Sequence, residues 1–419
     1  MSGNYKSSGA AQALPTTTGI GLPLNVRMGI LAALVGIAIL LLASAIDSEM
    51  GQFWAFGLAF GFVLQRSRFC FASAFRDIFL LRHSRSLQAV ILGLIVATIG
   101  FAVLMARQVP NTNLPILPPT ANVLPIGLHT IVGGLTFGVG MVVAGGCVSG
   151  TIYRMGEGYI ASWVSLGGIM IGLLGASFTW NWWWDNHISS GAQIWLPHYF
   201  GHGGAVAVTI VGLIGVYLLA LWWESRGGIV LPEAPFHAND DESFRAKVGN
   251  LWRRVFVHGW PILIGGAVLG FLNVTMFVAS HPWGFTGEVS RWVIGLTNFA
   301  GIGPGTLNGA SSLPGCALDM GETGILHHML FLVWGMVFGS FVAALLSGEF
   351  KIRLPRQKTR YYQAVGGGAV MGYGAGIAMG CTIGAFFSSI PSLGLNGWVF
   401  ALFLAIGAWV GTQIIQRIE

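Results

Sequence analysis

Residues 132–158 read VGGLTFGVGMVVAGGCVSGTIYRMGEG, and residues 365–389 repeat the pattern as VGGGAVMGYGAGIAMGCTIGAFFSS. Each stretch begins as an apolar, glycine-dense helix and breaks near a cysteine, Cys147 in the first and Cys381 in the second. Aligned through these cysteines, the stretches share glycines at Gly133/Gly367, Gly134/Gly368, Gly138/Gly372, Gly140/Gly374, Gly146/Gly380 and Gly150/Gly384. The chain therefore contains an internal repeat whose two copies both break at a cysteine.

The composition excludes a soluble protein. The 419 residues are 54% hydrophobic and only 9% charged, whereas a soluble domain has about 25% charged residues. We predict an all-α integral membrane protein whose surroundings are the lipid bilayer. The excess of 21 Lys and Arg over 15 Asp and Glu then indicates membrane orientation. We expect no nucleic-acid partner, because no soluble domain exists to present a basic face.

Apolar runs predict about ten transmembrane helices. The predicted spans cover residues 28–46, 53–80, 87–106, 126–146, 158–178, 204–223, 259–279, 325–347, 364–380 and 395–416. The predicted organisation is a disordered N-terminal tail (1–25), a first transmembrane half (26–223), a cytoplasmic linker (224–258) and a second transmembrane half (259–419).

Basic residues predict the orientation of these spans. They cluster near residues 82–85, between 226 and 254, and between 351 and 360. The positive-inside rule places these loops and both termini in the cytoplasm of an inner membrane. The two repeat copies are then an odd number of crossings apart and enter the membrane from opposite faces. Inverted repeats with interrupted helices are typical of transporters.

One outer loop is rich in tryptophan, a residue that often anchors proteins at the membrane interface. We interpret these side chains as an interfacial belt. They are Trp180, Trp182, Trp183, Trp184 and Trp195.

A third cysteine, Cys70, lies in LQRSRFCFASAFRD (64–77). This segment interrupts an apolar stretch with Arg66, Arg68, Arg76 and Asp77. Two interpretations stay open. The segment is either a re-entrant helix pair whose arginines attract anions at the cytoplasmic mouth of a pathway, or a membrane boundary marked by basic anchors.

The three cysteines have a structural and a functional interpretation. Buried cysteine is often only a small hydrophobic residue. Cys147 and Cys381, however, lie between a glycine-rich face and a broken turn, and irregular backbone at membrane depth survives only within protein or beside a cavity. A neutral thiol is a weak donor and a polarizable acceptor, which suits a soft sulfur-bearing anion that must also be released. Helix N-termini after the breaks would add positive potential. We expect the two thiols to meet at one narrow point.

The segments that contain these cysteines resemble the YeeE/YedE family of bacterial membrane proteins. The matching blocks are GFVLQRSRFCFASAFRD (61–77), VGGLTFGVGMVVAGGCVSGTIYRMGEG (132–158) and GGGAVMGYGAGIAMGCTIG (366–384). The resemblance implies an hourglass-shaped helical protein with inverted pseudo-symmetry. It also implies uptake of thiosulfate through a constriction where the anion passes along cysteine thiols by S–H···S contacts.

Site residues and a partner follow from this resemblance. The implied substrate-binding thiols are Cys70, Cys147 and Cys381. Arg76, Asp77, Arg154 and Glu157 fall on motif positions and are expected to shape the mouths or brace the broken helices by ion pairing. A small cytosolic TusA-like sulfur carrier is implied as a partner. The YedE branch is linked with selenium, so a related sulfur or selenium anion stays open as the substrate.

Cys316 belongs to none of these blocks; it either lines an outer vestibule or packs. A membrane thiol oxidoreductase is the rival function, although no two of the four cysteines are adjacent in a C-x-x-C turn. A third alternative is a passive membrane anchor for a soluble partner. Histidines at 187, 198, 202, 327 and 328 match no metal motif, so we expect no metal and no cofactor. No G-x-x-x-x-G-K-[ST] sequence occurs, which argues against ATP hydrolysis by this chain.

Overall fold

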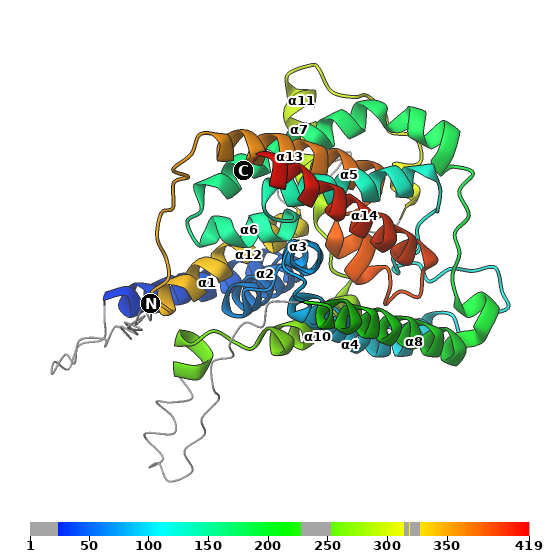
Figure 1. Ribbon diagram of the computed structural model, residues 1–419, viewed down its shortest axis with the longest axis horizontal. Coiled ribbons are helices and arrows are strands. Elements are labelled where there is room, and N and C mark those ends of the chain that lie inside the picture. Colours follow the sequence, from blue (N-terminus) through cyan, green and yellow to red (C-terminus); the bar gives the residue numbers. More distant parts are fainter. Residues whose placement is uncertain (1–23, 228–252, 314–317, 319–326, 419) are drawn as a thin grey trace, which may run out of the picture.

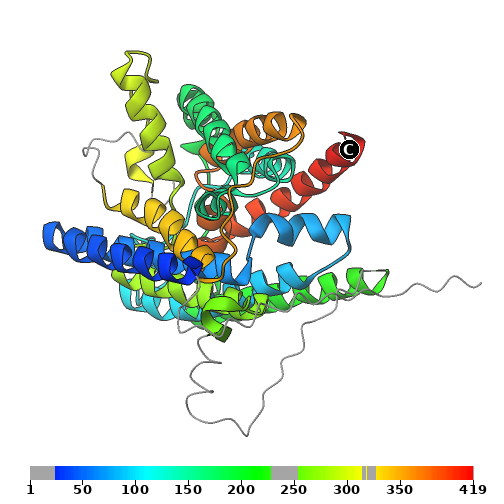
Figure 2. The same cartoon turned by 90° about the vertical axis from the view of Figure 1, so that its left-hand side faces the viewer.

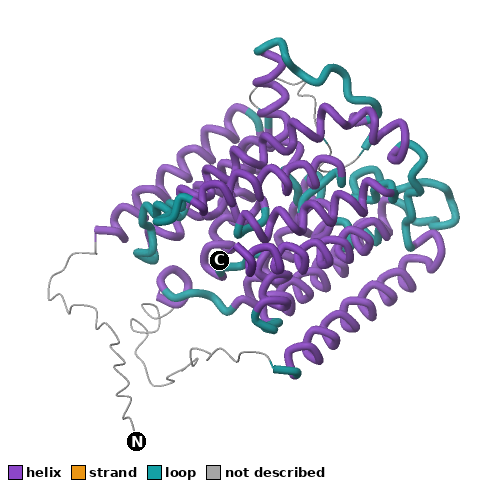
Figure 3. The backbone as a smooth tube through the Cα atoms, turned by 45° about the horizontal axis from the view of Figure 1, so that its top comes forward, coloured by secondary structure: helices purple, strands orange, loops and turns teal. Residues whose placement is uncertain are grey.

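The computed structural model describes residues 24–227, 253–313, 318 and 327–418. Within these ranges the chain is helical and has no named strand, only isolated bridges (Figure 3). Cys316 and most of the predicted tail and linker lie outside the described residues. The helices are α1 (Leu24–Ile46), α2 (Ser48–Ser67), α3 (Phe71–Leu80), α4 (Arg85–Gln108), α5 (Leu128–Ala144), α6 (Val148–Gly156), α7 (Ile160–Trp183), η1 (Trp184–Ile188), α8 (Pro197–Ser225), η2 (Arg253–Val257), α10 (Ile262–Ala279), α11 (Thr286–Phe299), η3 (Ala310–Ser312), α12 (His328–Leu346), α13 (Thr359–Ile377), η4 (Thr382–Ser388) and α14 (Leu395–Ile418).

The helices confirm a membrane protein with many spans. Eight described helices are long and apolar enough to cross a membrane, or nine if the bent pair α13–η4 is one span. The outer helices α1 and α8 expose large apolar side chains such as Leu34 and Leu218, as lipid contact requires. The count differs from the expected ten because the predicted span 53–80 consists of two helices, α2 and α3, separated at Arg68–Cys70.

The repeat copies pack against each other with inverted symmetry. Glycines bring α5 and α13 into backbone contact, and the two helices run antiparallel. A Cβ added to Gly133 would lie 2.7 Å from Ala378 Cβ, and one added to Gly367 would lie 2.4 Å from the Ala144 nitrogen. In the repeat alignment, Gly133 corresponds to Gly367 and Ala144 to Ala378. The contact of Gly133 with Ala378 therefore corresponds to the contact of Gly367 with Ala144. Such a matched pair of contacts is what a two-fold axis between the two helices requires. The other exchanged pairs are Gly140 with Met371 and Gly374 with Phe137.

The helices that follow the breaks also exchange partners. Gly134 of α5 approaches Phe400 and Leu404 of α14, while its equivalent Gly368 of α13 approaches Ser165 and Ile169 of α7. Each repeat copy therefore buries its glycine face in the other copy. These matched contacts are the ones that an inverted repeat is expected to make. Helices from the two predicted halves of the chain pack between one another.

A second set of helices surrounds this centre. Glycines also mediate close contact between α2 and α12, where Gly61 lies against the Met336 carbonyl, and between α4 and α10, where Gly270 lies against the Gly93 carbonyl. Figure 1 shows α4, α8 and α10 side by side along one edge, and Figure 2 shows α1, α2 and α12 grouped together. The segment α10–α11 resembles α2–α3, a long helix followed by a break and a shorter helix. Helix α11 was not expected, because Glu288 and Arg291 interrupt its apolar pattern.

The interfacial interpretation of the tryptophans is wrong for most of the group. Trp180 and Trp195 are fully buried and Trp183 nearly so, whereas Trp182 is exposed. The buried indoles donate hydrogen bonds inside the protein: Trp180 to the Asn308 carbonyl, Trp183 to the Tyr373 hydroxyl and Trp195 to the Ser392 carbonyl. Trp180 and Trp183 therefore tie α7 to neighbouring segments, and Trp195 ties the loop between α7 and α8 to the segment after η4.

The glycine contact of α5 and α13 predicts opposite effects of two identical substitutions. Gly140→Ala would place Cβ 2.3 Å from the Met371 nitrogen, whereas Gly215 of α8 has open space around the same position. Alanine favours a helix interior by about 1 kcal/mol over glycine, so Gly215→Ala should leave the Tm in detergent unchanged or raise it. Gly140→Ala should lower the Tm, by overpacking of about 1–3 kcal/mol. Equal Tm values for the two variants would contradict the close packing.

Candidate substrate site

The three described cysteines occupy the same kind of position. Cys70 is the N-cap of α3, Cys147 of α6 and Cys381 of η4, each with extended backbone directly after a break. All are free thiols and buried, with 5% exposure or less. The first turn of a helix has backbone N–H groups without helical partners and carries a partial positive charge. Each thiol therefore lies where an anion is favoured.

Two of these thiols lie together. Gly150, in the first turn of α6, faces both: a Cβ built on it would stand 3.1 Å from Cys70 Sγ and 3.5 Å from Cys147 Sγ. Cys147 Sγ accepts a hydrogen bond from the Gly150 N–H at 3.4 Å and lies 3.2 Å from Ser149 Oγ. A side chain at 150 would crowd the Cys70 thiol, so the glycine leaves room for the thiol pair. The pair could not be seen in the sequence, where its members are far apart.

Cys381 has a different neighbour. Its thiol lies near Thr286, the first residue of α11, whose buried hydroxyl has no hydrogen-bond partner. The N-cap of α11 is Phe285, so a phenylalanine occupies the place that Cys70 holds at α3. Thr286 was missed from the sequence because it lies in no cysteine motif.

The cysteines are staggered along the α5–α13 pair. Ala144 and Ala378, the residues just before the two breaks, lie at opposite ends of the contact between these helices. Eleven residues separate Gly133 from Ala144, a rise of about 16 Å. This geometry favours an arrangement in which Cys70 and Cys147 lie near one end of the α5–α13 pair and Cys381 lies near the other end. The sequence led us to expect instead that Cys147 and Cys381 meet at a single point.

Aromatic side chains bridge the two levels. Phe71, next to Cys70, packs edge-on against Phe387 of η4 at 5.1 Å between ring centroids. Phe387 also contacts Trp283, which stacks on Phe60 of α2 at 3.9 Å. The α3 and η4 breaks therefore share one aromatic wall, and apolar walls lower the local dielectric around any bound charge.

The charged motif residues make different local contacts. Arg154 donates to the Gly145 carbonyl at 2.8 Å and so ties α6 back to the end of α5. The main-chain carbonyl of Glu157 accepts from Arg353 at 3.1 Å. Arg76 pairs with its neighbour Asp77 at 2.8 Å. Of these contacts, the one made by Arg154 spans a break, whereas Arg76 and Asp77 pair within α3 and Glu157 takes part through its main chain. None of them is placed in contact with a cysteine thiol by a hydrogen bond within the described chain.

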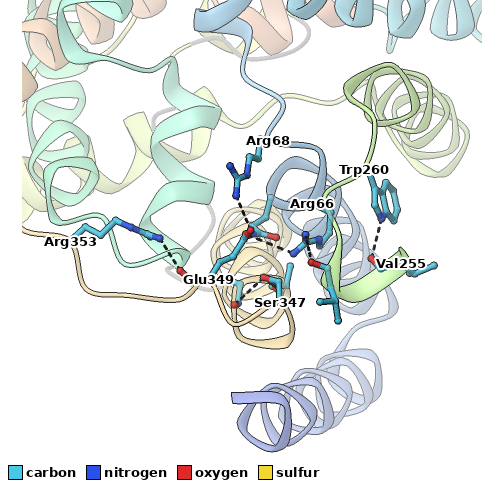
Figure 4. A network of polar contacts seen from close by, with 11 residues as sticks. Arg66, Arg68, Val255, Trp260, Ser347, Glu349 and Arg353 are labelled. Carbon is cyan, nitrogen blue, oxygen red and sulfur yellow. Dashed lines mark hydrogen bonds and ion pairs between the residues drawn. The ribbon is translucent and has the colours of Figure 1, made fainter. Parts of the chain in front are cut away.

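An ionic cluster, missed in the sequence, lies at the end of α2 just before Cys70 (Figure 4). Glu349, after α12, accepts from Arg68 at 2.7 Å and from Gln65 at 2.8 Å, and lies 3.9 Å from Arg66. Burial opposes ionisation of this carboxyl, but the hydrogen bonds from Arg68 and Gln65 and the charge of Arg66 outweigh it and lower the pKa of Glu349. Glu349 therefore carries its charge at neutral pH.

Inverted broken helices, glycine-mediated packing and buried thiols at the breaks define the class: a multi-span membrane protein of the inverted-repeat transporter type. The sulphur transport family matches residues 66–410, and the chain belongs to this family. It is 29% identical to the thiosulfate transporter TsuA of Spirochaeta thermophila over 86% of this chain and 97% of the relative. It is also 29% identical to the Escherichia coli TsuA (86% and 92%) and 31% identical to the probable transporter YedE of Salmonella typhimurium (48% and 47%).

The geometry predicts selective oxidation of one cysteine pair. The Cys70 and Cys147 sulfur atoms both lie next to the position that a Cβ on Gly150 would occupy. The oxidant copper phenanthroline should therefore join them in a disulfide, with removal of two protons and two electrons. Peptide mass spectrometry of membranes should find this cross-link in clear excess over cross-links that contain Cys381. Cys147→Ser is the control and should abolish the product. A dominant Cys147–Cys381 disulfide would contradict the staggered arrangement.

Proposed function

We propose that this protein takes up thiosulfate across the bacterial inner membrane through a constriction lined by Cys70, Cys147 and Cys381. The observation that carries the proposal is the thiol pair of Cys70 and Cys147, buried at two helix N-termini where the backbone is broken. The TsuA relatives support thiosulfate as the substrate.

The chemistry of the site suits this anion. Thiosulfate presents a soft terminal sulfur and hard oxygens. Neutral thiols donate weak S–H···S bonds to the sulfur, and helix N-termini favour the negative charge. Each contact is weak, so the anion is held without being trapped, as conduction requires. The stagger between the thiol pair and Cys381 makes the contacts successive.

Orientation and partner complete the proposal. Both termini and the basic loops lie in the cytoplasm. A TusA-like sulfur carrier receives imported sulfur there, and the exposed basic segment between 351 and 360 supports its docking, because cationic surfaces attract acidic partners.

Single cysteine substitutions test the relay. A bacterium unable to take up sulfate is grown on thiosulfate as its only sulfur source, and initial uptake of ³⁵S-thiosulfate is measured at equal expression. Cys70→Ala, Cys147→Ala and Cys381→Ala should each lower the uptake rate about tenfold or more, equivalent to about 1.4 kcal/mol in the barrier. Serine at the same positions should restore part of the rate, because a hydroxyl also donates but binds sulfur less well.

Thr98→Ala is the matched control, since Thr98 is a buried hydroxyl on α4 that bonds only its own helix. It should keep the wild-type rate. Wild-type uptake in all three alanine variants would refute the relay. Stronger competition by selenite or another selenium oxyanion than by unlabelled thiosulfate would reassign the substrate to that anion.

The second candidate is a membrane thiol oxidoreductase, favoured by the proximity of Cys70 and Cys147 in space despite their separation in the chain. Such an enzyme needs a Cys70–Cys147 disulfide in one state of its cycle. Trapping with an alkylating reagent during thiosulfate uptake separates the two functions. A relay keeps both thiols alkylatable throughout, whereas the enzyme accumulates a protected disulfide.

A further inference from the structure

We propose a second anion site, in which the guanidinium groups of Arg66 and Arg68 receive thiosulfate and Glu349 acts as a tethered carboxylate that the anion displaces. This inference rests on the proposed function and adds to it a second binding site and a carboxylate that competes for that site. Glu349 would occupy the site when no anion is present and compete for it when one arrives.

Arg66 is the first reason to expect a ligand. Its side chain is 1% exposed, and its Nε and one terminal nitrogen have no hydrogen-bond partner, while the other terminal nitrogen reaches the Val257 carbonyl at 3.3 Å. A buried guanidinium with unmet donors is costly, because its desolvation is not compensated. An oxyanion offers acceptors that a guanidinium binds in pairs.

Glu349 satisfies the donors of this arginine cluster only in part. It is bound closely by Arg68 and Gln65, but its distance of 3.9 Å to Arg66 is too long for a hydrogen bond. The carboxylate is 30% exposed and comes from the short segment after α12, so it has room to move away. Gln65, itself fully buried, has an unpaired side-chain oxygen at the same place.

The position of the cluster fits a path that continues from the thiols. Arg68 lies at the left-handed turn that ends α2, two residues before Cys70, whose thiol faces Gly150. In the proposed path, an anion that leaves the thiol pair reaches these guanidinium groups next. A fixed pair of arginines alone would hold a dianion too tightly. A carboxylate that returns to the site promotes its release, because conduction requires weak binding at every station.

The test is removal of the carboxylate charge. Purified protein in detergent is titrated with ³⁵S-thiosulfate at low salt, and efflux of trapped thiosulfate from proteoliposomes is followed. Glu349→Gln should bind thiosulfate about fivefold more tightly and release it more slowly, since the competitor is gone. Arg66→Gln and Arg68→Gln should each weaken binding about tenfold. Glu349→Asp, which keeps the charge but shortens its reach to Arg68, should lie between Glu349→Gln and the wild type.

Glu224→Gln is the matched control. Glu224 is 25% exposed and pairs with His83 and Ser84, away from the arginine cluster. It should bind like the wild type. If Glu349 only braces the fold, Glu349→Gln and Glu349→Asp will both bind no more tightly than the wild type, which overturns the inference while uptake by the wild type leaves the proposed function standing. A wild-type protein that neither binds nor transports thiosulfate would reject the proposed function and this inference with it.

Discussion

The antiparallel backbone contact between α5 and α13 is the constraint on which the rest of the structure depends. Glycine is required on both sides, because every added Cβ meets main-chain atoms of the partner at less than 3 Å at positions such as Gly140 and Gly367. Such close approach lets two helices pack in a membrane, where no hydrophobic effect drives them together. It also determines where the helices end, and hence where Cys147 and Cys381 lie.

The breaks that follow this contact create the chemistry. A helix that stops inside the bilayer must satisfy its terminal groups within the protein. Here Arg154 binds the carbonyl of Gly145, and the thiol of Cys147 accepts the N–H of Gly150. Cys147 thus helps to satisfy the broken backbone and also lines the proposed path. Replacing it changes both the local fold and the site.

Much of this was predictable from the sequence, for physical reasons. The glycine repeat with its two cysteines indicated broken helices in inverted copies, because glycine spacing along a helix is local information. The pairing of Cys70 with Cys147, the contact of Cys381 with Thr286 and the cluster around Glu349 were not predictable, since each joins distant segments whose relative position depends on packing. The tryptophans misled because an amphipathic indole suits a membrane interface and also suits a buried site with one carbonyl acceptor, as Trp195 shows.

Among the described residues, the two copies differ at one helix start that bears on the proposed path: the N-cap of α11 is Phe285, whereas the N-cap of α3 is Cys70. A row of sites that differs from end to end speeds entry from one side and exit on the other, but it cannot by itself pump, because differential affinity within a passive path leaves the equilibrium across the membrane unchanged. For such a passive path, accumulation of sulfur in the cell requires chemical consumption of the anion as it emerges, because an ion gradient drives uptake only where the polypeptide couples the two fluxes.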